Sequence, residues 1–340
     1  MSVGPAQRVD EFLDLAVEGS SKAAIDLVLR LLDDLVPSGT IISELLVPVQ
    51  REVGARWQRD ELSVADEHLA TGVTESALHA LVGVDAVPAK TGLVVLACAE
   101  GDWHALASRM FAEQLRSRGV VVAFLGASTP ADQIATFVRR HRPEALAVSC
   151  TSALFYTGVP PLADAAHAAG IPVLVGGRAL SGQPDRSRRL GADAEPDDAD
   201  AAITILDDWR EHPPVVRVDP TPLPADALEL DRRAGELGEV AFGELARRFS
   251  PMATYDDRQI ARTREDLAYI VRYVAAAHLV DDPAVFTSFL DWLLEVLAPR
   301  GVPRGAVAAS LDVLQPLVGE VSRAGGHLIT IGRQHLEDTG

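Results

Sequence analysis

The hydrophobic pattern at the centre of the chain constrains the fold most, because it alternates between two periods. Short apolar runs typical of buried strands occur at residues 93–97, 120–125, 145–149 and 172–175. Amphipathic stretches with helical spacing lie between them, at residues 104–118, 130–141 and 158–169. This alternation predicts a doubly wound parallel sheet, which a strand near 192–194 and a helix over 198–210 would complete. We place this α/β domain at residues 90–211.

Helical segments flank the central domain on both sides. Residues 1–86 hold four helix-like stretches that predict a four-helix bundle. They are residues 7–18, a run capped by Ser20 or Ser21 and stopped at Pro37, a run with apolar residues from Ile41 to Trp57, and a run that starts at Ser63. Pro48 should kink the third of them. A short linker is expected at 87–91 and a second at 212–224, which contains five prolines. Residues 223–340 predict an all-helical domain with helices over 225–249, 255–279, 283–298, 303–322 and from about 325.

Charge and cysteine content narrow the class of protein. The 340 residues include 31 Lys and Arg against 49 Asp and Glu, a net charge of −18, which argues against nucleic-acid or anionic-membrane partners. Two cysteines, Cys98 and Cys150, cannot make a disulfide framework. No stretch approaches the ~18 apolar residues of a membrane span, and the N-terminus has no signal-peptide pattern. We therefore expect a cytoplasmic protein without a membrane partner.

The loop after the first predicted strand carries the chemistry. Asp102 and His104 lie there, where ligands of parallel sheets gather. The Asp-x-His spacing lets the carboxylate accept from one imidazole nitrogen, so the other nitrogen suits a metal. Taken alone, this pair is more often an ordinary surface histidine beside an acid.

Together with two later motifs, the pair resembles the signature of cobalamin-binding domains. That signature is DxHxxG, then SxL/T, then GG, and the matching residues here are Asp102, His104, Ala107, Ser149, Thr151, Gly176 and Gly177. The resemblance implies a Rossmann-like domain in which His104 is the lower cobalt ligand, with the cofactor's own base displaced. Ser149 and Thr151 would contact the displaced nucleotide tail, and the glycines would leave room for it. Trp103 is also assigned to the cofactor-binding residues. Ala107 departs from the family, which has glycine there.

The helical segment before the sheet resembles the cap of cobalamin proteins. The matching residues are Val53, Gly54, Trp57, Val64, Ala65, Glu67 and His68. Corrinoid methyl carriers and light-sensing adenosylcobalamin receptors share this arrangement, and in the receptors the Trp and the Glu-His pair cover the adenosyl group. There, light breaks the cobalt–carbon bond and the lid repacks. Gln58 stands where the light-sensing transcription regulators have a histidine that captures cobalt after illumination, so the ligand that follows illumination stays open.

The whole arrangement resembles the photocobilins, photoreceptors that bind cobalamin and biliverdin. The resemblance implies a globin-like C-terminal domain, with candidate bilin-binding residues Tyr255, Arg258, Arg262, Arg264, Tyr269, Arg272, Tyr273 and His278. No cysteine follows Cys150, so a bilin in this domain would be non-covalent. A solvated helix face is the plain alternative, and haem on His278, His327 or His335 is the rival cofactor.

We therefore expect a light sensor and not an enzyme. It would form a homo-oligomer whose state depends on light, with a protein partner as a further route of output. The alternative is a corrinoid methyl-carrier protein. A cobalamin-dependent isomerase is disfavoured, because the chain lacks a barrel of ~250 residues for radical chemistry.

Overall fold

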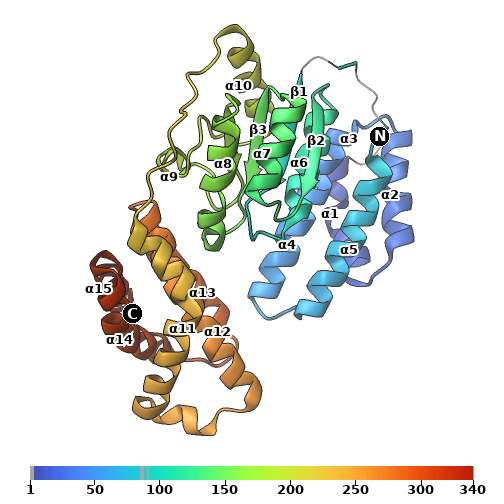
Figure 1. Cartoon of the computed structure of the whole chain (residues 1–340). Coiled ribbons are helices and arrows are strands. Elements are labelled where there is room, and N and C mark those ends of the chain that lie inside the picture. Colours follow the sequence, from blue (N-terminus) through green and yellow to red (C-terminus); the bar gives the residue numbers. More distant parts are fainter. Residues whose placement is uncertain (1–3, 85–87, 90–91, 340) are drawn as a thin grey trace. The chain divides into compact units, whose positions relative to one another are not determined.

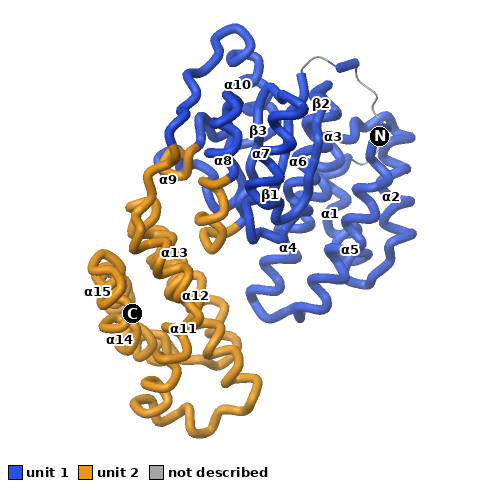
Figure 2. The backbone as a smooth tube through the Cα atoms, in the orientation of Figure 1, with its two compact units in different colours: residues 1–151, 162–187, 192–219 blue, residues 152–161, 188–191, 220–340 orange. Residues whose placement is uncertain are grey.

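The computed structural model describes residues 4–84, 88–89 and 92–339, and by contacts between residues the chain divides into two compact units. The first unit consists of three segments, residues 1–151, 162–187 and 192–219. The second comprises residues 152–161, 188–191 and 220–340 (Figure 2). The predicted linker at 87–91 lies mostly outside the described residues.

The first unit begins with a helical cap domain, residues 4–84. Its elements are η1 (Pro5–Arg8), α1 (Val9–Val17), α2 (Ser21–Asp33), α3 (Ser38–Ile41), η2 (Ile42–Leu46), α4 (Val47–Gln58) and α5 (Val64–Leu81). Helices α1, α2, α4 and α5 lie side by side (Figure 1). Phe12 on α1, Leu27 on α2, Leu45 on η2 and Leu78 on α5 are almost completely buried between these elements. The predicted N-terminal helical domain is confirmed.

Local chemistry in the cap differs from the prediction at two helix starts. Pro48 occupies the first turn of α4, and the irregularity that a proline causes takes the form of a π-helical turn, η2, just before it. Ser20 stands at the N-cap of α2, yet its side chain makes no capping hydrogen bond. By contrast, Ser63 caps α5 through a full capping box with Asp66.

The α/β domain of the first unit is a four-stranded parallel sheet in the order β2-β1-β3-β4. Its strands are β1 (Leu93–Cys98), β2 (Val121–Gly126), β3 (Ala145–Ser149) and β4 (Val173–Gly176). Its helices are α6 (Ala105–Arg116), α7 (Ala131–His141), α8 (Pro160–His167), α9 (Pro184–Arg189) and α10 (Ala199–Glu211), with α8 beginning and α9 ending in segments of the second unit. One sheet face packs on α6 and α10. The predicted parallel α/β fold is confirmed.

The fifth strand predicted near Ala192–Ala194 is wrong. Only one parallel bridge, between Leu174 and Ala194, joins this segment to β4. Gly191, with a φ of 95°, turns the chain just before it, and Pro196 follows soon after. The extended stretch between them is therefore too short to form a ladder.

The second unit is all-helical, as predicted. Its elements are η3 (Ala153–Gly158), α11 (Ala225–Arg248), η4 (Ser250–Thr254), α12 (Asp257–Leu279), α13 (Ala284–Leu297), α14 (Arg304–Val321) and α15 (Arg323–Asp338). Apolar side chains such as Val274, Phe286, Leu290 and Leu311 form its buried core. None of the helices in the described ranges is long and apolar enough to cross a membrane.

Candidate functional site

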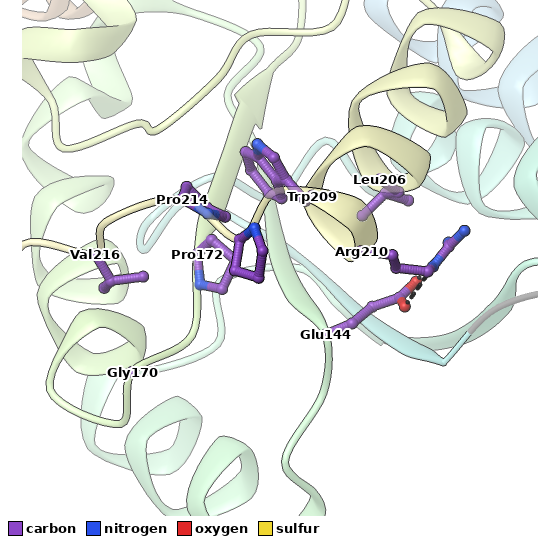
Figure 3. A pocket seen from close by; sticks show the side chains of 9 residues that line it. Glu144, Gly170, Pro172, Leu206, Trp209, Arg210, Pro214 and Val216 are labelled. Atoms are coloured by element: carbon purple, nitrogen blue, oxygen red, sulfur yellow. Dashed lines mark hydrogen bonds and ion pairs between the residues drawn. The ribbon is translucent and has the colours of Figure 1, made fainter.

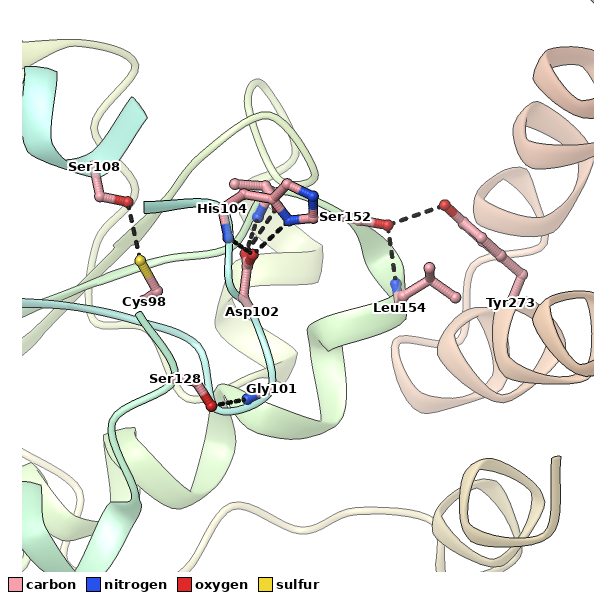
Figure 4. Close-up of polar contacts among 10 residues, drawn as sticks. Cys98, Gly101, Asp102, His104, Ser108, Ser128, Ser152, Leu154 and Tyr273 are labelled. Atoms are coloured by element: carbon pink, nitrogen blue, oxygen red, sulfur yellow. Dashed lines mark hydrogen bonds and ion pairs between the residues drawn. The ribbon is translucent and has the colours of Figure 1, made fainter. Parts of the chain in front are cut away.

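A buried carboxylate organises the loop after β1. Asp102 has no exposed surface. Its Oδ1 accepts from the backbone N–H and the Nδ1 of His104, each at 3.0 Å. Its Oδ2 accepts from the backbone N–H of Thr151 at 2.9 Å and from the Thr151 hydroxyl at 2.8 Å (Figure 4). One carboxylate thus ties the loop after β1 to the end of β3.

This hydrogen bonding fixes the charge and the tautomer of the pair. Burial would raise the pKa of Asp102, but the hydrogen bonds from His104 and Thr151 outweigh it and hold the pKa below its usual range. The hydrogen bond that His104 donates to the Asp102 carboxylate in turn raises the pKa of His104, against the opposing effect of desolvation. Since an ionised carboxylate only accepts, the neutral imidazole carries its proton on Nδ1. The nitrogen that can bind a metal is therefore Nε2, on a side chain that is 70% exposed.

Ser128, which the sequence analysis missed, locks the same loop from the end of β2. Its hydroxyl accepts from the backbone N–H of Gly101 at 3.0 Å, and its own N–H donates to the carbonyl of Asp102 at 3.1 Å. In this position the Ser128 backbone has a φ of 46°, in the left-handed region that is unfavourable for residues other than glycine. The turn residues after the second predicted strand were the available signal, because the carboxyl ends of neighbouring parallel strands meet at one edge.

The remaining motif residues lie on the same edge of the sheet. Ser149 pairs in register with Cys98 on one side and with Gly176 on the other, so the ends of β1, β3 and β4 are adjacent. A Cβ on Gly176 would meet only the carbonyl of Pro196, at an ordinary 3.5 Å. Gly177 differs, since its φ is 107° and a Cβ would come within 2.4 Å of the Cys150 carbonyl oxygen. The backbone itself requires glycine at 177, whereas Gly176 has space beside it.

The cap packs on α6, the helix that follows His104. Its buried core includes Met110, and Leu106 packs against it, so α6 of the α/β domain is shared by both parts of the first unit. The negative charge of Glu67, on α5, contributes to the raised pKa of His104. The two side chains therefore lie close enough for electrostatic interaction. Trp57 is half-buried against the cap core, while His68 is largely exposed beside Glu67, with 3.5 Å between Nε2 and Oε2.

The exposed surface near His104 is partly apolar. Trp103, in the loop after β1, is 76% exposed, and Ala107, on α6, is also exposed. On the cap, Val64 is exposed at the start of α5. This residue set fits a corrinoid: one imidazole nitrogen for an axial bond and apolar side chains for a flat macrocycle. Cobalamin would be held by His104, with the Asp102 carboxylate behind it.

A separate small cleft lies at the opposite edge of the sheet (Figure 3). Its volume is about 140 Å³, and Trp209, Pro172 and the ion pair of Arg210 with Glu144 line it. Glu144 and Pro172 directly precede β3 and β4, so this cleft marks the amino ends of the strands. It has no residue in common with the motif at the carboxyl ends.

The candidate bilin residues are in the second unit, and several have partners there. Arg262 pairs with Glu265, Arg264 pairs with Glu239 and lies over the ring of Phe242, and His278 contacts Asp226 at 2.9 Å. Arg272 binds both Asp231 and the carbonyl of Leu154. The Tyr273 hydroxyl is 3.0 Å from that of Ser152 (Figure 4). The Tyr273 ring stacks on that of Phe289. Tyr255 is half-buried, while Arg258 and Tyr269 are exposed.

Comparison with protein families identifies both parts of the first unit. Residues 92–204 match the family model of a B12 binding domain. Residues 8–82 match a second model, which is also described as a B12 binding domain. The chain is a B12-binding protein. Its cofactor is a cobalamin, and the motif at the carboxyl edge and the cap that faces it both lie inside the matched segments.

Curated relatives and a solved structure resemble the same region. The chain is 31% identical over 159 residues to the HTH-type transcriptional repressor CarH of Myxococcus xanthus and 35% identical over 161 residues to the repressor CarA of the same organism. These matches cover 46% and 45% of this chain, and 52% and 53% of the relatives, so the chain spans about half their length. The monomethylamine corrinoid protein of Methanosarcina barkeri has the same fold over 58% of this chain and 97% of its own, with a TM-score of 0.52 and 22% identity.

Proposed function

We propose that this B12-binding protein is a light sensor that binds adenosylcobalamin with His104 as the lower cobalt ligand. The observation that carries the proposal is the hydrogen-bonded triad of Thr151, Asp102 and His104. The Glu67 carboxylate of the cap lies near the same imidazole. It supports a cofactor held between the sheet edge and the cap. When bound, adenosylcobalamin supplies the photochemistry, because light breaks its cobalt–carbon bond.

The protein's own residues orient and shield the site. Asp102 holds the His104 ring and keeps its proton on Nδ1, which makes Nε2 the better donor. On the cap, the Trp57 ring would exclude water, and the Glu67 carboxylate would accept hydrogen bonds from hydroxyl or amine groups of a bound adenosyl group. Because these contacts would hold the cap only while the adenosyl group is bound, the cap would repack without it. The protein is proposed to act by this change and not as an enzyme.

We also propose that the helical second unit carries biliverdin, bound without a covalent bond. In support, Arg258 and Tyr269 are exposed on α12, and Tyr255 lies just before it. The partners found for Arg262, Arg264, Arg272 and His278 make these four weaker candidates than the sequence pattern implied. The pair of His278 with Asp226 likewise weakens the haem alternative at that residue.

One spectroscopic experiment tests both cofactors. The full chain is purified with adenosylcobalamin and biliverdin in darkness, and its absorption spectrum is recorded before and after green light. We expect corrin bands that change within seconds to minutes of illumination and a separate far-red bilin band. A corrin spectrum indifferent to light would overturn the sensor, and a haem band in place of the bilin band would overturn the biliverdin assignment. Tight preference for methylcobalamin, with turnover by a methyltransferase, would assign a methyl carrier instead.

A further inference from the structure

A hydrogen-bond network of polar side chains crosses the interface between α4 and α5 in the cap. The Nε2 of Gln50, on α4, is 2.8 Å from the hydroxyl of Thr74, and its Oε1 is 3.2 Å from the hydroxyl of Thr71. The Thr71 hydroxyl is also 2.9 Å from Oε1 of Glu67. Thr74 is fully buried, and around it the interface is apolar, with Ala70 and other side chains of both helices buried. Polar groups in such a setting are costly unless each finds a partner.

The donor of each hydrogen bond in this network can be assigned in order. The Thr74 hydroxyl donates to the carbonyl of Ala70 at 2.9 Å, so its oxygen accepts from the Gln50 amide. This orients the amide and directs Gln50 Oε1 toward Thr71. Thr71 has a single hydroxyl proton and two acceptors within reach, Gln50 Oε1 and Glu67 Oε1. The charged carboxylate is the stronger acceptor and the nearer one.

We propose that Thr71, held by Gln50, is a positioning residue for Glu67 and sets the preference of the site for an upper cobalt ligand that donates hydrogen bonds. This inference rests on the proposed role of Glu67 at the upper face. The Thr71 hydroxyl holds one carboxylate oxygen of Glu67, so the other oxygen keeps one orientation for an incoming donor. The orientation is set before the ligand binds, which lowers the entropic cost of binding.

The test compares dissociation constants of the full chain for adenosylcobalamin and methylcobalamin in darkness. Thr71→Val keeps the shape of the side chain and removes the hydroxyl. We expect it to weaken adenosylcobalamin binding roughly tenfold, the effect of one lost hydrogen bond to a charged group. The dissociation constant for methylcobalamin, whose methyl ligand donates no hydrogen bond, should change by less than about twofold. Thr71→Ser should restore the preference.

A matched control lies on the same helix. Ser76 is half-buried on α5 and its hydroxyl donates to the carbonyl of Gly72 at 2.9 Å, so Ser76→Ala removes a hydroxyl outside the network of Gln50, Thr71 and Thr74. It should leave both constants unchanged. Thermal unfolding of the cobalamin-free Thr71→Val and Thr71→Ser variants shows whether either has lost the fold. A purely structural role of Thr71 would weaken both cobalamins equally, and that outcome overturns the inference.

Glu67→Ala separates this inference from the proposed function. If Glu67→Ala leaves the ratio of the two dissociation constants unchanged, the proposed role of Glu67 is wrong. If it lowers the preference for adenosylcobalamin but Thr71→Val does not, the positioning role of Thr71 alone is wrong. In the Glu67→Ala background, Thr71→Val should have no further effect on the ratio, because the group that it positions is missing.

Discussion

At the residue scale, two neighbouring glycines lack a side chain for different reasons. Gly177 has a φ of 107° and lies against the backbone of Cys150, so the fold requires it. Gly176 has room for a methyl group in the cobalamin-free protein. The sequence pattern assigned both to space for the cofactor tail, because it could not distinguish a backbone constraint from a ligand constraint.

This difference predicts opposite behaviour of two alanine variants. Gly177→Ala should destabilise the cobalamin-free protein by about 1–3 kcal/mol through backbone strain. Gly176→Ala should change its stability by less than about 0.5 kcal/mol, yet weaken cobalamin binding, because the added methyl group occupies the path proposed for the tail. Thermal unfolding and cobalamin titration measure the two effects. Gly176→Ala with unchanged affinity would place the tail elsewhere.

The residues around His104 show what a sequence can and cannot predict. The Asp102–His104 bond was predictable, because two residues of spacing bring the carboxylate within reach of the ring. The bonds from Thr151 to Asp102 and from Ser128 to the same loop were not, since they join segments that only the folded sheet brings together. Thr151 was expected at the nucleotide tail, and in the structure its hydroxyl contacts the carboxylate behind the metal ligand.

At the element scale, the four strands that form were predicted as closely as the long helices, and the strand expected at 145–149 is β3, Ala145–Ser149. Helix α11 was expected over 225–249 and is Ala225–Arg248, and α13 was expected over 283–298 and is Ala284–Leu297. Apolar spacing and flanking proline define such ends well. The fifth strand and the short elements η3 and α9 were mispredicted or missed, because three to six residues carry too little periodicity.

Helix packing in the second unit predicts a contrast between two glycines. A Cβ on Gly332 would come within 2.4 Å of the Phe286 ring, whereas one on Gly235 would meet nothing within 4 Å. Gly332→Ala should therefore destabilise the protein by about 1–3 kcal/mol through overpacking. Gly235→Ala should stabilise it by up to about 1 kcal/mol, because alanine favours helix. Denaturant unfolding compares them, and equal effects would contradict the packing described here.

The junction of α11, α12 and α15 predicts a dependence on pH. Asp226 accepts from the Ser322 hydroxyl at 2.7 Å and from His278 at 2.9 Å, and these bonds lower the pKa of Asp226 despite partial burial. Its stabilising effect is thus present above the unfolded pKa of about 3.9 and is lost as the pH falls through the lower folded value. Asp226→Asn should lower the Tm at about pH 7, and its Tm should approach that of the unchanged protein as the pH falls through the folded pKa of Asp226. A constant difference in Tm would argue against this linkage.

At the scale of the whole molecule, the net charge of −18 favours protein partners over nucleic acid. We propose that light changes the association of copies of this chain. Light scattering of the cobalamin-loaded protein should give different masses before and after green light, while Glu67→Ala should reduce the difference. A mass that stays constant under illumination, although the corrin spectrum changes, would move the output to a separate protein partner.

Electron paramagnetic resonance reports on the proposed bond between His104 and cobalt. Cobalamin bound to the full chain is reduced to the cobalt(II) state, and spectra are compared between unlabelled protein and protein that contains nitrogen-15 histidine. An axial histidine nitrogen should split each cobalt line into a triplet that becomes a doublet with the label, and His104→Ala should abolish this response. A triplet that persists in the labelled protein would mean that the cofactor keeps its own base, which would contradict the account.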